Sequence, residues 1–82
     1  MTNFKDDLVI DQAALTRRLR LLRLDQGWTI YELGTKARID PTHVSHLEAG
    51  RRQLTLDVAS RYARAFGCTI DEVIGFNHND GK

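Results

Sequence analysis

Residues 29–48, TIYELGTKARIDPTHVSHLE, decide how this chain folds. Thr29 opens a capping box because Glu32 follows three residues later, so that each side chain can satisfy a backbone donor of the other residue. Asp40 and Pro41 mark a second helix start, since Asp is a favoured N-cap and Pro is accepted at the first helical position. The stretch therefore predicts two short helices joined by a tight turn.

The two helices should run over about residues 30–37 and 41–49, with a turn of about three residues between them. Close packing at a steep angle needs small or apolar inward positions, and the sequence supplies Gly34, Ala37, Ile39, Val44 and Leu47. The second helix carries polar residues at the positions expected to face outward, namely Thr42, His43, Ser45 and His46. This layout is a helix-turn-helix, whose second helix enters the major groove of DNA.

Helical signals continue on both sides of this pair. Leucines at 15, 19 and 22 recur at helical spacing after an Asp N-cap, and Gly27 ends a helix predicted over about residues 12–26. Thr55 caps a further helix whose predicted apolar stripe is Leu56, Ala59, Ala63 and Phe66. Thr69 and Glu72 form a second capping box that opens a short fifth helix. The predicted fold class is all-α, a compact five-helix domain.

Length and charge agree with one small domain. The 82 residues leave room for a domain over 11–76, with an N-terminal extension at 1–10 and a flexible C-terminal tail at 77–82. The net charge is only +1, but residues 17–64 hold ten Lys and Arg against five acids. A basic centre with acidic ends fits a nucleic-acid surface and fits a solvated helical surface equally well.

Several classes of protein are disfavoured. A single cysteine, the lack of a signal-peptide pattern and the lack of a membrane-length apolar run favour a cytoplasmic protein that spans no membrane. The sequence holds no activated nucleophile, no paired carboxylates, no phosphate loop and no metal signature, so we expect no enzymatic activity and no cofactor.

Three segments, residues 19–33, 39–51 and 63–73, together resemble the lambda-repressor and Cro-like (Xre-type) helix-turn-helix family. The resemblance implies a lambda-repressor-like DNA-binding domain that binds a double-stranded operator as a two-fold homodimer. It implies base contacts from Pro41, Thr42, His43 and His46, and phosphate contacts from Thr29, Ser45, Arg51 and Arg52. It also implies a structural ion pair between Arg23 and Glu48.

The sequence departs from the family pattern in the helix-turn-helix itself. Ile30 replaces a Gln that commonly touches phosphate, and Gly34 replaces the usual Ala, which weakens the helix but allows closer packing. Arg38 stands where the turn often has Gly, so a positive φ would be costly and we expect the turn to differ slightly. Leu54 stands where Pro is frequent.

Other residues allow more than one interpretation. His43 and His46 have a spacing that can hold a metal, but no third ligand is evident, so we expect no metal site. Cys68 and Trp28 are expected to pack in the core rather than to sense redox state or stack on a ligand. Tyr31 is expected to reach phosphate or to be exposed. The arginines of the first helix are expected to be solvated.

Dimerisation is predicted through the fifth helix, whose apolar residues exceed what a monomer can easily cover: Ile70, Val73, Ile74 and Phe76. The leading functional hypothesis is a repressor or controller protein that binds a near-palindromic operator. One alternative is the antitoxin of a toxin–antitoxin pair, which would also bind a protein partner of unknown identity. Another is a protein-interaction module built on the same fold.

Overall fold

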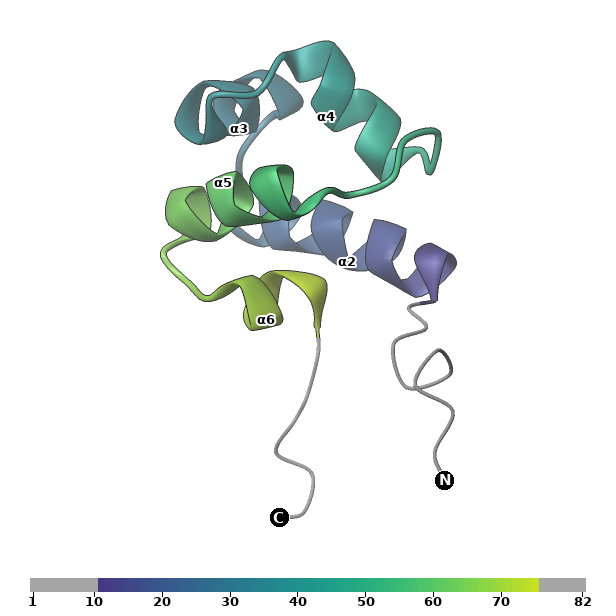
Figure 1. Ribbon diagram of the computed structural model, residues 1–82. Helices are drawn as coiled ribbons and strands as arrows, with labels where there is room; N and C mark the ends of the chain where they lie inside the picture. The colour runs from purple at the N-terminus through teal and green to yellow at the C-terminus, as the bar shows by residue number, and fades with distance from the viewer. Residues whose placement is uncertain (1–10, 76–82) are drawn as a thin grey trace, which may run out of the picture.

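The computed structural model describes residues 11–75, which form helices throughout and contain no strand (Figure 1). The helices are α2 (Gln12–Asp25), α3 (Ile30–Ala37), α4 (Pro41–Glu48), α5 (Leu56–Phe66) and α6 (Ile70–Ile74). The predicted all-α class is confirmed, and the local capping signals set the helix ends. The expectations for the extension at 1–10, for the tail at 77–82 and for Phe76 lie outside the described residues.

Side-chain capping begins each helix within residues 11–75. The hydroxyls of Thr29, Thr55 and Thr69 and the carboxylates of Asp11 and Asp40 each accept a hydrogen bond from a backbone N–H in the first turn. Both predicted capping boxes are complete, because the Glu at N3 also accepts from the N-cap N–H. Satisfied first-turn donors explain why such short helices have sharp starts.

The helices are arranged around one core (Figure 1). α3 and α4 pack against each other and form one side of the molecule. α2 contacts α4 and α6, while α5 contacts α3 and α6, so α2 and α5 lie between the helix pair and α6. The buried apolar residues come from each of the helices α2 to α6, and the largest of them that are fully buried are Tyr62, Leu19, Leu33, Leu47, Val44 and Val73.

The apolar face of α5 differs from the predicted stripe. Leu56 is 74% exposed, whereas Val58 and Tyr62, which the stripe omitted, are 8% and 0% exposed. Leu56 is the first residue of the helix and lies about 120° around it from Tyr62, at about 100° per residue. It therefore stands at the edge of the buried face of α5.

Two expectations about aromatic and basic side chains have clear outcomes. Trp28 packs on the core as predicted: its ring stacks on Phe66 with centroids 5.3 Å apart, and Lys36 Nζ lies 4.9 Å above it. Arg18, expected to be solvated, instead donates from Nε to the Glu72 carbonyl of α6 at 2.8 Å.

No helix within residues 11–75 is long and apolar enough to span a membrane.

Candidate nucleic-acid interface

α4 buries two apolar residues on one side and exposes two polar residues on the other. Val44 and Leu47 are 0% and 2% exposed, while Thr42 and Ser45 are exposed on the opposite side. Asp40 holds the start of the helix, because its carboxylate accepts from the Thr42 N–H at 2.8 Å. The helix thus presents short polar side chains from a firmly anchored first turn, which is what reading base edges in a groove requires.

His43 is not among these outward residues. It is half-buried, and its Nε2 atom is buried with no hydrogen-bond partner in the part of the chain that the structure describes. The reason is helical geometry: His43 precedes the buried Leu47 by four residues, about 40° around the helix. The resemblance implied a base contact from His43, and burial of Nε2 removes that nitrogen from the groove-facing surface. His46 and Pro41 are each half-buried.

The turn between α3 and α4 keeps a left-handed conformation in spite of its arginine. Arg38 has φ 59° and ψ 48°, so the expectation that the turn would avoid a positive φ is wrong. A non-glycine residue in this region costs about 1–2 kcal/mol. Two contacts offset that cost: the Ile39 N–H donates to the Gly34 carbonyl at 2.9 Å, and Arg61 Nη1 of α5 donates to the Arg38 carbonyl at 2.9 Å.

Gly34 lets this turn lie close to α3. A Cβ atom at this position would be 2.7 Å from the Ile39 carbonyl oxygen and 3.3 Å from Pro41 Cγ. Because the nearest atom belongs to the backbone, any side chain here would push α4 away from α3. The structure therefore shows the close packing that we expected from a glycine in place of the family's alanine. This packing sets the position of α4 relative to α3.

A buried ion pair ties α2 to the end of α4. Arg23 Nε lies 2.7 Å from Glu48 Oε2 and Nη2 lies 2.9 Å from Oε1, so the pairing implied by the family resemblance is present in bidentate form. The two side chains are only 11% and 7% exposed. Arg23 Nη1 also donates to the Trp28 carbonyl at 2.8 Å. The hydrogen bond to Glu48 raises the pKa of the Arg23 guanidinium, which therefore keeps its positive charge.

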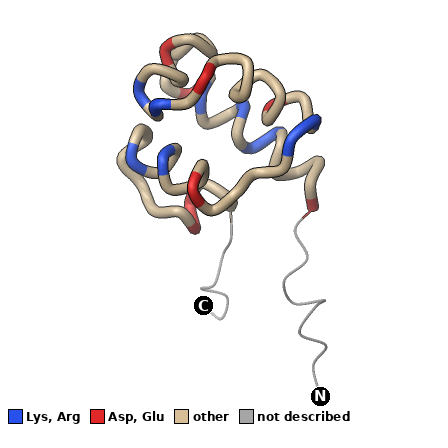
Figure 2. Tube along the Cα trace, turned by 45° about the horizontal axis from the view of Figure 1, so that its top comes forward, with Lys and Arg blue, Asp and Glu red and all other residues tan. Residues whose placement is uncertain are grey.

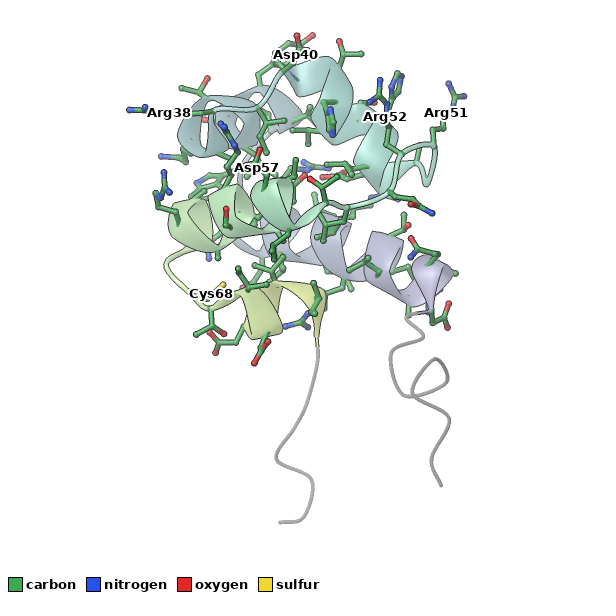
Figure 3. All side chains as sticks on the ribbon, viewed as in Figure 1. Arg38, Asp40, Arg51, Arg52, Asp57 and Cys68 are labelled. Atoms are coloured by element: carbon green, nitrogen blue, oxygen red, sulfur yellow. The ribbon has the colours of Figure 1, made fainter. Side chains whose placement is uncertain are left out.

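Basic residues flank the helix pair. Arg51 and Arg52 are exposed in the loop after α4, and Arg38 is exposed at the opposite end of this layer, with Asp40 between them (Figure 3). Lys and Arg are also spread along the other helices, so the surface is mixed rather than uniformly basic (Figure 2). Arg38 was not among the predicted phosphate contacts. A basic residue in the turn of the helix-turn-helix was the sequence signal that could have suggested such a contact.

An open groove of about 490 Å³ lies between the starts of α3 and α4. It is lined by Ile30, Tyr31, Asp40, Pro41, Thr42 and Ser45. Tyr31 is 73% exposed at its edge. Thr29 lies at the start of α3, where its hydroxyl accepts from the Glu32 N–H at 3.0 Å and keeps its own proton to donate.

The fifth helix offers less free apolar surface than predicted. Val73 is fully buried in the core, and Ile70 and Ile74 are half-buried against it. Val73 faces inward because α6 packs against both α2 and α5, which the sequence pattern of five residues does not reveal.

Within residues 11–75, no three His, Cys, Asp or Glu side chains gather as a metal site would require.

Comparison with known families agrees with this geometry. A family model described as Helix-turn-helix matches residues 19–73, which is more than half of the chain. The match runs from the middle of α2 to α6 and includes the α3–α4 pair, the Arg23–Glu48 pair and the basic loop.

Two curated relatives carry the names of a repressor and of a hypothetical transcription factor. The chain is 30% identical over 57 residues to the competence pilus inhibition repressor of Acinetobacter baylyi, covering 70% of this chain and 52% of that protein. It is 30% identical over 63 residues to the Neisseria hypothetical transcription factor of Neisseria meningitidis serogroup B, covering 77% and 59%. The chain therefore spans between one half and three fifths of these two relatives.

A solved structure shares the fold. The clp gene regulator ClgR from Corynebacterium glutamicum superposes with a TM-score of 0.68 and 32% sequence identity, covering 76% of this chain and 80% of that one. The family match and these similarities group the chain with helix-turn-helix proteins that are named as regulators.

Proposed function

This chain belongs to the lambda-repressor-like helix-turn-helix family of DNA-binding regulators, and on that premise we propose that it represses or controls transcription from a near-palindromic operator. It would bind double-stranded DNA as a two-fold dimer and act in the cytoplasm. The recognition helices of such a dimer would lie about 34 Å apart, one turn of DNA.

One observation carries the proposal: α4 exposes Thr42 and Ser45 while a bidentate buried ion pair and a fixed turn hold its two ends. We assign base reading to Thr42 and His46. Pro41 lines the protein groove between the starts of α3 and α4, beside Thr42. We assign phosphate contacts to Ser45, to the start of α3 at Thr29, and to Arg51 and Arg52, and we add Arg38 at the other end of the motif. His43 is left out because its Nε2 is buried.

The test separates positioning from reading. An operator is first selected from random duplexes, and each variant is then titrated on that operator and on random DNA at several salt concentrations. Arg51→Ala should weaken binding to both DNAs by similar factors and reduce the salt slope by about one, because one counterion is no longer released. Arg51→Lys keeps the charge and should keep the slope.

Thr42→Ala and His46→Ala should behave differently. Each should cost about 1–3 kcal/mol on the operator and little on random DNA, because contacts to base edges carry the sequence information. If Arg51→Ala lost only operator affinity, or if both groove-facing variants discriminated as well as the wild type, the docking of α4 would be wrong. Failure to select any operator would remove the proposed function itself.

A further inference from the structure

α2 has a second face that nothing in the described part of the chain covers. Leu21 and Leu24 are 60% and 49% exposed, although both are large apolar residues. They lie on the side of the helix away from the buried Leu15 and Leu19, and Ala14 and Arg17 continue the same face at helical spacing. Two neighbouring exposed leucines on one helix face are typical of a contact surface rather than of a solvated one.

This face is hollowed along its length. A groove of about 590 Å³ runs along it, lined by Ala14, Arg17, Arg18, Leu21, Leu22, Leu24 and Asp25. Arg18 forms part of the wall and is held from behind, because its Nε and Nη2 both donate to the Glu72 carbonyl of α6. Its side chain lies against Gly75, where a Cβ atom would be 2.7 Å from Arg18 Cδ. These contacts hold Arg18 in place at one wall of the groove.

We infer that this face binds a second copy of the chain, with α2 packing antiparallel against α2 of its partner about a two-fold axis at Leu21. The charges on the face carry the inference. Arg17 and Asp25 stand four residues before and four residues after Leu21, one helical turn on either side. In an antiparallel pair centred there, Arg17 of each copy lies opposite the partner's Asp25, and the two Leu21 side chains meet at the axis.

Such a surface is complementary to itself, which is what an isologous dimer requires. A helix of 14 residues buries less than the roughly 1,200 Å² typical of stable interfaces, so the free dimer should be weak and concentration-dependent. The inference deepens the proposed dimer by naming its interface, and it replaces the one predicted on α6. Its test uses no DNA, so its failure would leave the proposed DNA binding untouched.

The experiment is sedimentation of the full chain from low micromolar to several hundred micromolar concentration. The wild type should pass from monomer to dimer over this range. Arg17→Asp and Asp25→Arg should each weaken the dimer at least tenfold, because each homodimer would then set like charges opposite each other twice. Far-ultraviolet circular dichroism should not change, since both residues are exposed.

Rescue tests the register. An equimolar mixture of Arg17→Asp and Asp25→Arg should dimerise like the wild type, because both cross-pairs become opposite in charge. The chain carrying both substitutions should do so as well. Arg64→Asp, an equal charge change at an exposed residue of α5, is the matched control and should leave the dimer unchanged.

Three results would overturn the inference. The first is a wild type that stays monomeric at every concentration, as it would if another part of its own chain covered the leucines. The second is a dimer insensitive to both single substitutions. The third is a mixture that stays monomeric, which would place the contact elsewhere or in another register.

Discussion

Removal of Glu48, the buried partner of Arg23, should destabilise the domain more than removal of an exposed charge. In Glu48→Ala the Arg23 guanidinium keeps its charge but loses both hydrogen bonds to the carboxylate, at 2.7 and 2.9 Å, while only 11% of its side chain is exposed. Breaking a buried pair by removing one partner costs about 3–5 kcal/mol, because the other charge stays buried without compensation.

That loss is large for this chain. A domain of 82 residues has a stability of about 4–12 kcal/mol at roughly 0.05–0.15 kcal/mol per residue, so Glu48→Ala should lie close to the limit of folding. At about 4–8 °C per kcal/mol, the melting temperature should fall by more than about 12 °C. Urea unfolding followed by the fluorescence of Trp28 measures it directly, because Trp28 packs against the core and its carbonyl accepts from Arg23.

A double-mutant cycle isolates the pair. Arg23→Met combined with Glu48→Leu removes both charges and keeps apolar volume, so it should recover most of the loss that either single variant shows. The unpaired Trp28 carbonyl should hold it about 1 kcal/mol below the wild type.

The control is the exposed pair between Arg61 and Asp57, which are 3.2 Å apart with side chains 38% and 71% exposed. Asp57→Ala should cost less than about 1 kcal/mol. If Glu48→Ala cost no more than Asp57→Ala, or if the cycle showed no coupling, the assignment of the Arg23–Glu48 pair as the link between α2 and α4 would be refuted.

Further outcomes are expected at Gly34, Tyr62 and Cys68. Gly34→Ala should lower stability by about 1–3 kcal/mol despite the better helix propensity of Ala, because its Cβ would be 2.7 Å from the Ile39 carbonyl oxygen; a raised melting temperature would contradict this. Tyr62→Phe should not destabilise at pH 7, because the buried hydroxyl has no hydrogen-bond partner within residues 11–75. Burial raises the pKa of Tyr62, so the protonated form of its hydroxyl favours folding. In alkaline urea titrations the wild type should therefore lose stability as the pH rises above about 10, by up to about 1.4 kcal/mol per pH unit. Tyr62→Phe should lack this loss. Burial also raises the pKa of the Cys68 thiol (Figure 3), so iodoacetamide should label it more slowly than a free cysteine at pH 7.5, and equal rates would show that the thiol is accessible and reactive.

The helices could be predicted from the sequence because their signals are local. Thr29 and Glu32, or Thr69 and Glu72, satisfy each other's backbone groups within one turn, so the chain needs no distant contact to begin a helix there. The outward place of Thr42 on α4 follows from helical spacing alone. So does the inward place of Leu47.

Features that join distant parts of the chain could not be predicted in the same way. The bond from Arg18 to the Glu72 carbonyl spans 54 positions, and the bond from Arg61 to the Arg38 carbonyl spans 23. Each depends on which helices become neighbours, and the second helps to hold a left-handed residue that local sterics alone disfavour.

The sequence by itself determined the helices, their caps and the polar face of α4, because each depends on residues within one or two turns. Only the tertiary structure decided that His43 turns its Nε2 inward, that Val73 is core rather than interface, and that Leu21 and Leu24 are left exposed. Periodicity tells which residues share a helix face. It does not tell which face a neighbouring helix covers, because burial is settled by the packing of all the helices at once.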